Sequence, residues 1–356
     1  MSLIETGGGA DVFDGVVGQE RAVQRLRAAA EQPVHAYLFL GPRGTGARQA
    51  AFGFAALLLS ADAASAGDAA AVERHRRLAT TGTHADLVLI APQGTQFRDE
   101  EAKEVIRSAA TSPAEGSRKV IVIEEAHTFN PTAIGTLLKV IEEPSASTHF
   151  VLLAEEVPPE MITIESRCVT VEFGPVPVSL IETTLFTEGI DPRRAKMAAA
   201  AAAGDIDRAR LLANDPALSQ RAELWASVPG RLDGTGSVVV GLVDELRAAM
   251  DAAQEPLTER HEGELAELDE RVKVTGERGS GRADLVAQHK REIRRLRADE
   301  LRFGLATLSR HYRDRLIAAS DPSAESALAA LATAVDALQR NPNEALLLQR
   351  LFLELA

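Results

Sequence analysis

The stretch Gly41-Pro42-Arg43-Gly44-Thr45-Gly46-Ala47-Arg48 decides the fold of this chain. It follows an apolar run at Ala36–Leu40 and precedes an alanine-rich helical run from Ala50 to Leu59. A phosphate-binding loop (P-loop) has the pattern G-x-x-x-x-G-K-[ST] between a strand and a helix, and Gly41 and Gly46 have that spacing. The context therefore predicts an α/β domain that is built around this loop.

The loop lacks the side chains that perform its usual chemistry. Ala47 stands where the pattern has Lys, which reaches the β- and γ-phosphates, and Arg48 stands where it has the hydroxyl that holds Mg²⁺. The backbone cradle of Gly41, Gly44 and Gly46 needs only glycines to receive an anion. We expect a loop that holds an anion or nothing and does not hydrolyse ATP, and we expect no cofactor. Taken alone, the stretch would favour a mere tight turn, but the acidic segment downstream favours the P-loop.

A pair of carboxylates follows a second apolar strand. Val120–Ile123 ends at Glu124 and Glu125. In P-loop ATPases the first acid after this strand helps to hold Mg²⁺, and the next activates water. The first acid here is Glu instead of the usual Asp, and the extra methylene displaces its carboxylate enough to spoil tuned geometry. Two solvated acids at a strand end are the alternative, which the upstream P-loop disfavours.

Alternation of apolar runs with helical patterns predicts a parallel sheet covered by helices on both faces. The expected strands are Ala36–Leu40, Ala85–Ile90, Val120–Ile123, Phe150–Ala154 and Val169–Glu172. Leu59 to Gly82 is interpreted as a loop plus a helix. The predicted domains are a disordered tail at 1–11, an α/β domain at 12–175, a small helical domain at 176–216 and a larger helical domain at 217–356.

Within the last domain, an acidic segment and a basic segment flank a glycine-rich stretch. Thr258–Val272 is acidic, Gly276–Gly281 is a flexible turn, and Leu285–Arg302 is basic. This pattern predicts two antiparallel helices of complementary charge at about 258–302. A solvated hairpin with surface pairs worth about 0–1 kcal/mol each is the favoured interpretation. The alternative is a protruding arm that contacts DNA or a partner subunit.

Composition excludes several classes of protein. The 356 residues suffice for two or three domains, and the net charge of −13 argues against DNA binding by the whole surface. A single cysteine, Cys168, permits neither a disulfide framework nor a Cys-based zinc site. No apolar run approaches the length of a membrane span, and Met1–Ala10 has no secretory signal pattern. We therefore expect a cytoplasmic protein without membrane contact.

Further motifs carry a family resemblance. They are Phe13–Gln19, Thr83-His84-Ala85-Asp86, Leu137-Leu138-Lys139-Val140-Ile141-Glu142-Glu143-Pro144, Ser166-Arg167-Cys168, and Asn341-Pro342-Asn343 before a leucine-rich helix. With them the chain resembles, over nearly its whole length, the clamp-loader subset of AAA+ ATPases. The resemblance implies an AAA+ P-loop domain, a small helical lid and an all-α collar domain.

The bacterial members of that family are of two types. Motor subunits keep the loop Lys, whereas a second type has a degenerate loop and retains S-R-C, and this chain is similar to the second type. Family members usually carry a four-Cys zinc module before T-H-P-D. Ser60 to Gly82 contains no Cys, so the resemblance predicts no zinc and a loop or plain helix in its place.

The resemblance also implies roles for individual residues. Arg167, next to Ser166, would be an arginine finger that reaches in trans to the ATP of a neighbouring motor subunit. Such fingers increase the rate by about 10³–10⁵. Arg208 lies in the segment that corresponds to the family's sensor 2. It would have either a structural role or a phosphate contact, and the resemblance does not decide between them. Cys168 is interpreted as a small buried residue and not as a nucleophile.

The implied function is that of a non-hydrolysing scaffold subunit of the DNA polymerase III clamp loader. Its partners would be the gamma/tau motor subunits, the delta subunit, the sliding clamp and, through the assembly, primed DNA. Two other functions remain open. One is a divergent active AAA+ ATPase that uses another Lys, or Arg48, on the phosphates. The other is a DNA-binding adaptor outside replication that uses the basic arm at Leu285–Arg302.

Overall fold

The computed structural model describes residues 11–92, 96–275, 282–319, 321–338 and 342–356. The chain divides into two compact units, Met1–Thr184 with Gly204–Arg208, and Leu185–Ala203 with Ala209–Ala356. Of the expected tail at 1–11, only Asp11 is described. The expected glycine turn at 276–281 and Asn341 also lie outside the described residues. The domain boundaries at 175 and 216 remain predictions.

The first unit alternates strands with helices along the chain. Its elements are α1 (Glu20–Glu31), β1 (Ala36–Leu40), α2 (Ala47–Leu59), α3 (Ala61–Ser65), α4 (Ala69–Thr80), β2 (Leu87–Ile90), α5 (Asp99–Ala109), β3 (Lys119–Ile123), the 3-10 turn η1 (Ala126–Thr128), α6 (Pro131–Glu142), β4 (Thr148–Ala154), η2 (Pro159–Met161), α7 (Ile162–Glu165), β5 (Val169–Glu172) and most of α8 (Val178–Thr187).

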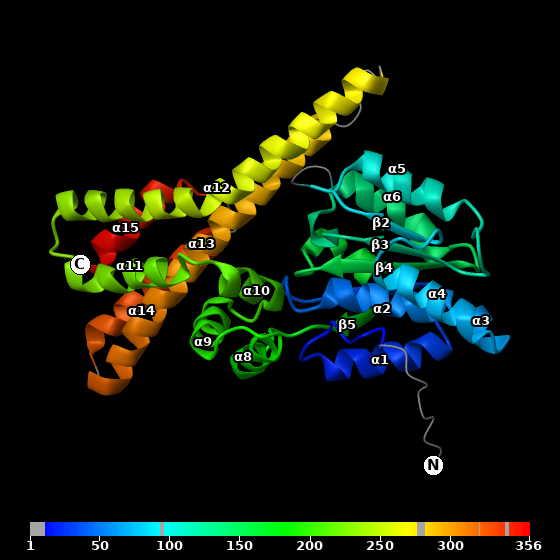
Figure 1. Ribbon diagram of the computed structural model, residues 1–356, viewed down its shortest axis with the longest axis horizontal. Helices are drawn as coiled ribbons and strands as arrows, with labels where there is room; N and C mark the ends of the chain where they lie inside the picture. Colours follow the sequence, from blue (N-terminus) through cyan, green and yellow to red (C-terminus); the bar gives the residue numbers. More distant parts are fainter. Residues whose placement is uncertain (1–10, 93–95, 276–281, 320, 339–341) are drawn as a thin grey trace, which may run out of the picture. The chain divides into compact units, whose positions relative to one another are not determined.

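All five predicted strands are present in one parallel sheet of order β2-β3-β4-β1-β5 (Figure 1). The α/β prediction is thus confirmed. β1 and β5 have the predicted bounds, whereas β2 begins at Leu87 and not at Ala85. The preceding Asp86 is 1 % exposed and accepts hydrogen bonds from the backbone of Ala114 and Glu115, so it anchors a neighbouring loop before the strand begins.

Helices cover both faces of the sheet, as the continuous apolar character of β1, β3 and β4 predicts. Leu38 belongs to the core that contains residues of α5 and α6, whereas Tyr37 and Phe39 belong to the opposite core, which contains residues of α1 and α2. This alternation follows from the two-residue period of a strand. The three central strands are therefore fixed rigidly between two layers.

The parallel sheet sorts the functional residues onto two edges. Gly41, Glu124 and Glu155 directly follow β1, β3 and β4, so they lie at the carboxyl edge. Arg167 precedes β5 and lies at the amino edge.

Residues 59–82 form two helices, α3 and α4, where a loop plus one helix was expected. Asp68 caps α4, because its carboxylate accepts the backbone N–H of Ala71 at 3.0 Å. The alanine-rich sequence therefore forms helix on both sides of a turn at Gly67, which has φ +72°.

The described part of the second unit is helical. Besides the end of α8, it contains α9 (Pro192–Ala201), α10 (Ile206–Asn214, from Ala209), α11 (Leu218–Arg231), α12 (Gly236–Thr275), α13 (Arg282–Ala319), α14 (Pro322–Leu338) and α15 (Glu344–Leu355). The predicted acidic helix at Thr258–Val272 is part of α12, which continues unbroken through Pro256. None of the described helices is long and apolar enough to cross a membrane.

Two buried contacts organise the second unit. Trp225 of α11 is 1 % exposed and lies against Gly304 of α13, where an added Cβ would be 2.1 Å from the indole Cε2. Arg221 donates to Glu300 at 2.9 Å and to Asp215 at 2.5 Å. Arg221 and Glu300 are both about nineteen-twentieths buried, so this ion pair ties α11 to α13 inside the core.

Candidate functional site

The glycine loop forms the turn that a P-loop requires. Gly44 and Gly46 have φ values of +66° and +89°, in the left-handed region that favours glycine. Gly46 is the residue before α2, and an added Cβ at Gly41 would lie 2.1 Å from the backbone oxygen of Phe173. The Thr45 hydroxyl closes the turn by donating to the Pro42 carbonyl at 2.7 Å. The predicted strand–loop–helix is confirmed.

An arginine stands at the hydroxyl position of the loop and pairs with the first acid after β3. Arg48, the second residue of α2, has its Nε 2.5 Å from Glu124 Oε1. The guanidinium thus neutralises the carboxylate that would otherwise help to hold Mg²⁺. Sequence reasoning named both residues and did not pair them. An Arg in the hydroxyl position was the available signal.

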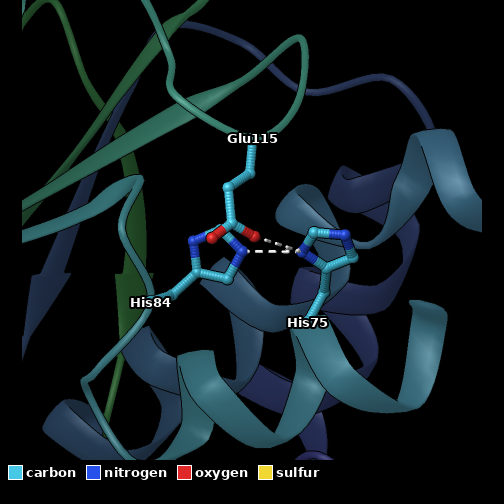
Figure 2. A group of neighbouring side chains, drawn as sticks. All are labelled: His75, His84 and Glu115. Carbon is cyan, nitrogen blue, oxygen red and sulfur yellow. Dashed lines mark hydrogen bonds and ion pairs between the residues drawn. The ribbon is translucent and has the colours of Figure 1, made fainter. Parts of the chain in front are cut away.

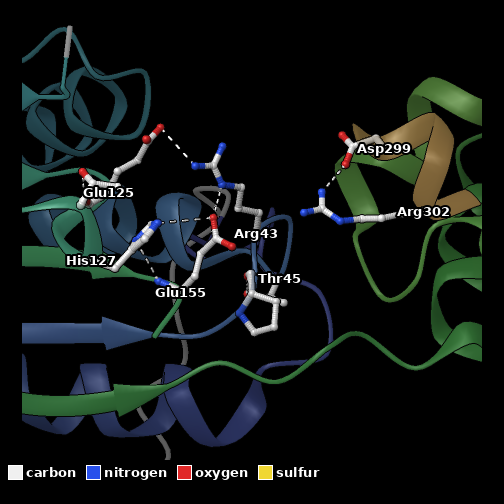
Figure 3. Close-up of polar contacts among 9 residues, drawn as sticks. Arg43, Thr45, Glu125, His127, Glu155, Asp299 and Arg302 are labelled. Atoms are coloured by element: carbon white, nitrogen blue, oxygen red, sulfur yellow. Dashed lines mark hydrogen bonds and ion pairs between the residues drawn. The ribbon is translucent and has the colours of Figure 1, made fainter. Parts of the chain in front are cut away.

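A second loop arginine binds the remaining carboxylates at this edge (Figure 3). Arg43 pairs with Glu155, and its Nη2 lies 3.3 Å from Glu125 Oε1. Glu125 has φ +53°, a conformation that non-glycine residues rarely adopt. His127 lies beside them, accepts the Glu155 backbone N–H at 3.3 Å, and has its pKa lowered by burial. The acids predicted to serve Mg²⁺ and water are therefore paired with arginines of the same chain.

A turn from the end of the first unit covers the loop. Ile206 N–H donates to the Gly44 carbonyl at 3.0 Å, and an added Cβ at Gly44 would lie 1.8 Å from Asp205 Oδ1. The Asp205 carboxylate also accepts the backbone N–H of Arg208 at 2.8 Å. Arg208 is 9 % exposed. Asp205, which sequence reasoning missed, thus places a negative charge against the glycine cradle.

Arg167 lies at the other edge of the sheet, between α7 and β5. Its Nε pairs with Glu142, and its Nη1 donates to the Thr163 carbonyl at 2.6 Å and to Ser166 Oγ at 3.0 Å. Its side chain is 37 % exposed. The neighbouring Cys168 is mostly buried, which raises the pKa of its thiol to about 12 and leaves it unreactive.

Three side chains that sequence reasoning did not group come together beside α4 (Figure 2). The candidate ligand atoms of His75, His84 and Glu115 lie within 4.8 Å of one another. His75 Nδ1 is 2.8 Å from His84 Nε2, and His84 Nδ1 accepts the Asp86 backbone N–H at 2.9 Å. These are residue types that ligate zinc.

The hydrogen bonds of this cluster argue against a metal in the observed arrangement. Because His84 Nδ1 accepts a proton, a neutral ring carries its hydrogen on Nε2 and donates it to His75 Nδ1. Neither His84 Nε2, which carries the hydrogen, nor His75 Nδ1, which accepts it, then has a lone pair left for a cation. Arg74 also binds both oxygens of Glu115, at 2.8 and 3.1 Å. The cluster is best described as a hydrogen-bonded link between α4 and the loop before β3.

The charged hairpin has the predicted antiparallel pairing. Arg260 and His261 of α12 contact Glu292 of α13, and His289 of α13 contacts Glu264 of α12 at 2.7 Å. The two histidine rings, both buried, stack with centroids 3.8 Å apart. Complementary surface pairs were predicted, whereas this buried stack was not.

Comparison with known proteins matches residues 18–177 to the family described as DNA polymerase III, delta subunit. The Bacillus subtilis DNA polymerase III subunit delta' is 30% identical over 192 residues, which cover 53% of this chain and 57% of the relative. The Pseudomonas aeruginosa subunit delta' is 35% identical over 140 residues, covering 39% of this chain and 42% of the relative. The matches thus span about half the length of these relatives.

A tau subunit and a solved structure are also similar. The Bacillus subtilis DNA polymerase III subunit tau is 32% identical over 163 residues, which cover 45% of this chain and 29% of that protein. A gamma subunit-related protein from Thermotoga maritima aligns over 93% of this chain and 97% of its own, with 13% identity and a TM-score of 0.43.

Proposed function

We propose that this chain, whose residues 18–177 match the family described as DNA polymerase III, delta subunit, is a clamp-loader subunit of the delta' type that does not hydrolyse ATP and supplies Arg167 to a neighbour's nucleotide site. Its proposed partners are the gamma/tau and delta subunits. The proposed task of the assembly is to load a sliding clamp onto primed DNA.

Three features of the loop support the absence of hydrolysis. The Lys is replaced by Ala47, Arg48 neutralises Glu124, and the Asp205 carboxylate lies against Gly44. A like charge about 4 Å from a phosphate opposes binding by about 4 kcal/mol at an effective dielectric constant near 20. A nucleotide would thus meet repulsion without the Lys that normally offsets it.

The single observation that carries the finger proposal is the position of Arg167. It lies at the amino edge of the sheet, whereas the loop of the same chain follows β1 at the carboxyl edge. The five residues of β1 span about 16 Å at roughly 3.3 Å each. An exposed guanidinium so placed serves a phosphate on another subunit and not the chain's own loop.

The test is a reconstitution with the delta and gamma/tau subunits of the same genome. Clamp- and DNA-dependent ATP hydrolysis is measured for wild type, Arg167→Ala and the control Arg231→Ala, which removes another exposed arginine paired with a carboxylate. We expect Arg167→Ala to assemble normally and to abolish the stimulation that this subunit provides, because one motor site loses its finger. The control should behave as wild type.

Three outcomes would contradict the proposal separately. ATP turnover by the isolated chain at a motor-like rate would support the divergent ATPase. An unchanged rate in an intact Arg167→Ala assembly would remove the finger. DNA binding by the isolated chain that weakens steeply with salt would favour the adaptor function.

A further inference from the structure

Two of the three guanidinium nitrogens of Arg167 are held by hydrogen bonds. Glu142 accepts from Nε, and the Thr163 carbonyl and Ser166 hydroxyl accept from Nη1. Nη2 has no hydrogen-bond acceptor among the residues that the structure describes. Nη2 is therefore the nitrogen that remains able to donate hydrogen bonds to a phosphate oxygen.

The groups that hold the guanidinium are fixed to the core. Glu142 is the last residue of α6, directly after Ile141, which is fully buried. Thr163 lies in α7 next to Ile164, which is also fully buried. The exposed side chain of Arg167 is thus bonded to two rigid helices, although it lies at the surface.

We propose that Glu142 is a positioning residue for Arg167, an inference that rests on the proposed function of Arg167 as a finger. A free arginine samples many rotamers, and the carboxylate on Nε restricts it to those in which Nε–H meets Glu142. Orientation before the reaction lowers the barrier, and a displacement of about 1 Å can reduce a rate by about 100-fold. Glu142 would act through Arg167 and would not touch the nucleotide itself.

The adjacent Glu143 provides a matched control. It has the same side chain and is also exposed, yet it is not among the hydrogen-bond and ion-pair partners of Arg167. A general effect of negative charge near α6 would affect Glu142→Gln and Glu143→Gln alike. An effect of orientation would appear only in Glu142→Gln.

The experiment uses the reconstituted assembly, with Arg167→Ala included. We expect Glu142→Gln to lower the stimulated kcat by about 10- to 100-fold, because a neutral amide replaces the charge-assisted hydrogen bond on Nε with a weaker one and loosens the orientation of the guanidinium, while KM for ATP and assembly remain unchanged. Glu143→Gln should equal wild type. In ¹⁵N NMR of the isolated chain, the Arg167 Nε–H should exchange slowly in wild type and Glu143→Gln, and rapidly in Glu142→Gln.

The outcomes separate the two proposals. If Arg167→Ala leaves ATPase unchanged, the finger fails, and the role of Glu142 fails with it. If Arg167→Ala lowers the rate and Glu142→Gln does not, only the positioning role is wrong. A rate that rises in Glu142→Gln would show that the carboxylate restrains the finger and would overturn the inference.

Discussion

Restoring the missing loop side chains should not restore nucleotide binding, because the Asp205 carboxylate lies against Gly44 of the cradle. The perturbation is the double variant Ala47→Lys with Arg48→Thr, which supplies the Lys and the hydroxyl and releases Glu124. Its comparison is the triple variant that adds Asp205→Asn. The substitution removes the charge but keeps an oxygen that can cap Arg208 N–H, so α10 should remain intact.

The magnitude follows from the position of the carboxylate. An added Cβ at Gly44 would lie 1.8 Å from Asp205 Oδ1, so the carboxylate is in contact with the loop glycine. A phosphate charge in the cradle would be about 4 Å away, which costs about 4 kcal/mol at an effective dielectric constant near 20. Because about 1.4 kcal/mol corresponds to tenfold in affinity, Asp205 should weaken binding by about 10³-fold.

Calorimetric titration with MgATP measures this difference. We expect no measurable heat for the wild type or the double variant, and binding about 10³-fold tighter than that of the double variant once Asp205→Asn is added. Asp205→Asn alone is the control and should remain weak, because Lys is still absent. Micromolar binding by the double variant, equal to that of the triple variant, would refute the reasoning.

Other perturbations test the packing and the titrating groups. Gly304→Ala should lower the free energy of unfolding by about 1–3 kcal/mol, because the added methyl group overpacks against Trp225. Trp225 is the sole tryptophan, so its fluorescence reports unfolding in urea. Gly241→Ala on α12 is the control and should not destabilise the protein, because the added methyl group would enter open space. Arg221→Leu should cost about 3–5 kcal/mol in the same assay, because it strands a buried carboxylate, and a loss below about 1 kcal/mol would contradict this. Burial lowers the pKa of His84, so as the pH decreases the unfolded chain binds the proton before the folded chain does. The contribution of neutral His84 to the free energy of unfolding should be fully present above about pH 6.5 and be lost as the pH decreases below it. In His84→Asn, the free energy of unfolding should depend less on pH.

Local patterns predicted the sheet and the loop well. The spacing of Gly41 and Gly46, the apolar runs and the two-residue alternation are properties of neighbouring residues, and together they are sufficient to identify a parallel sheet. The edge that holds Arg167 follows from the same information, because strand direction assigns each connection to one edge.

The pairs within the site could not be predicted in the same way. Arg48 pairs with Glu124, and Gly44 lies against Asp205, although both partners are far apart in the sequence. Local sequence patterns do not predict which residues come into contact over such separations. Both depend on how the sheet and the later turn fold back onto the loop. Charge complementarity was visible in the hairpin, but the buried stack of His261 and His289 depends on helix rotation, which charge patterns leave open.

The reciprocal His–Glu contacts of α12 and α13 have a mechanical consequence. Each helix carries His-x-x-Glu, and each histidine bonds the glutamate of the opposite helix, so the contacts are related by a local twofold axis. Sliding one helix along the other by a single turn would part both pairs together and leave two buried imidazoles without their carboxylates. The two helices therefore have a single favoured register. A force applied along one helix is transmitted to the other, because the helices cannot slide past each other without losing both pairs.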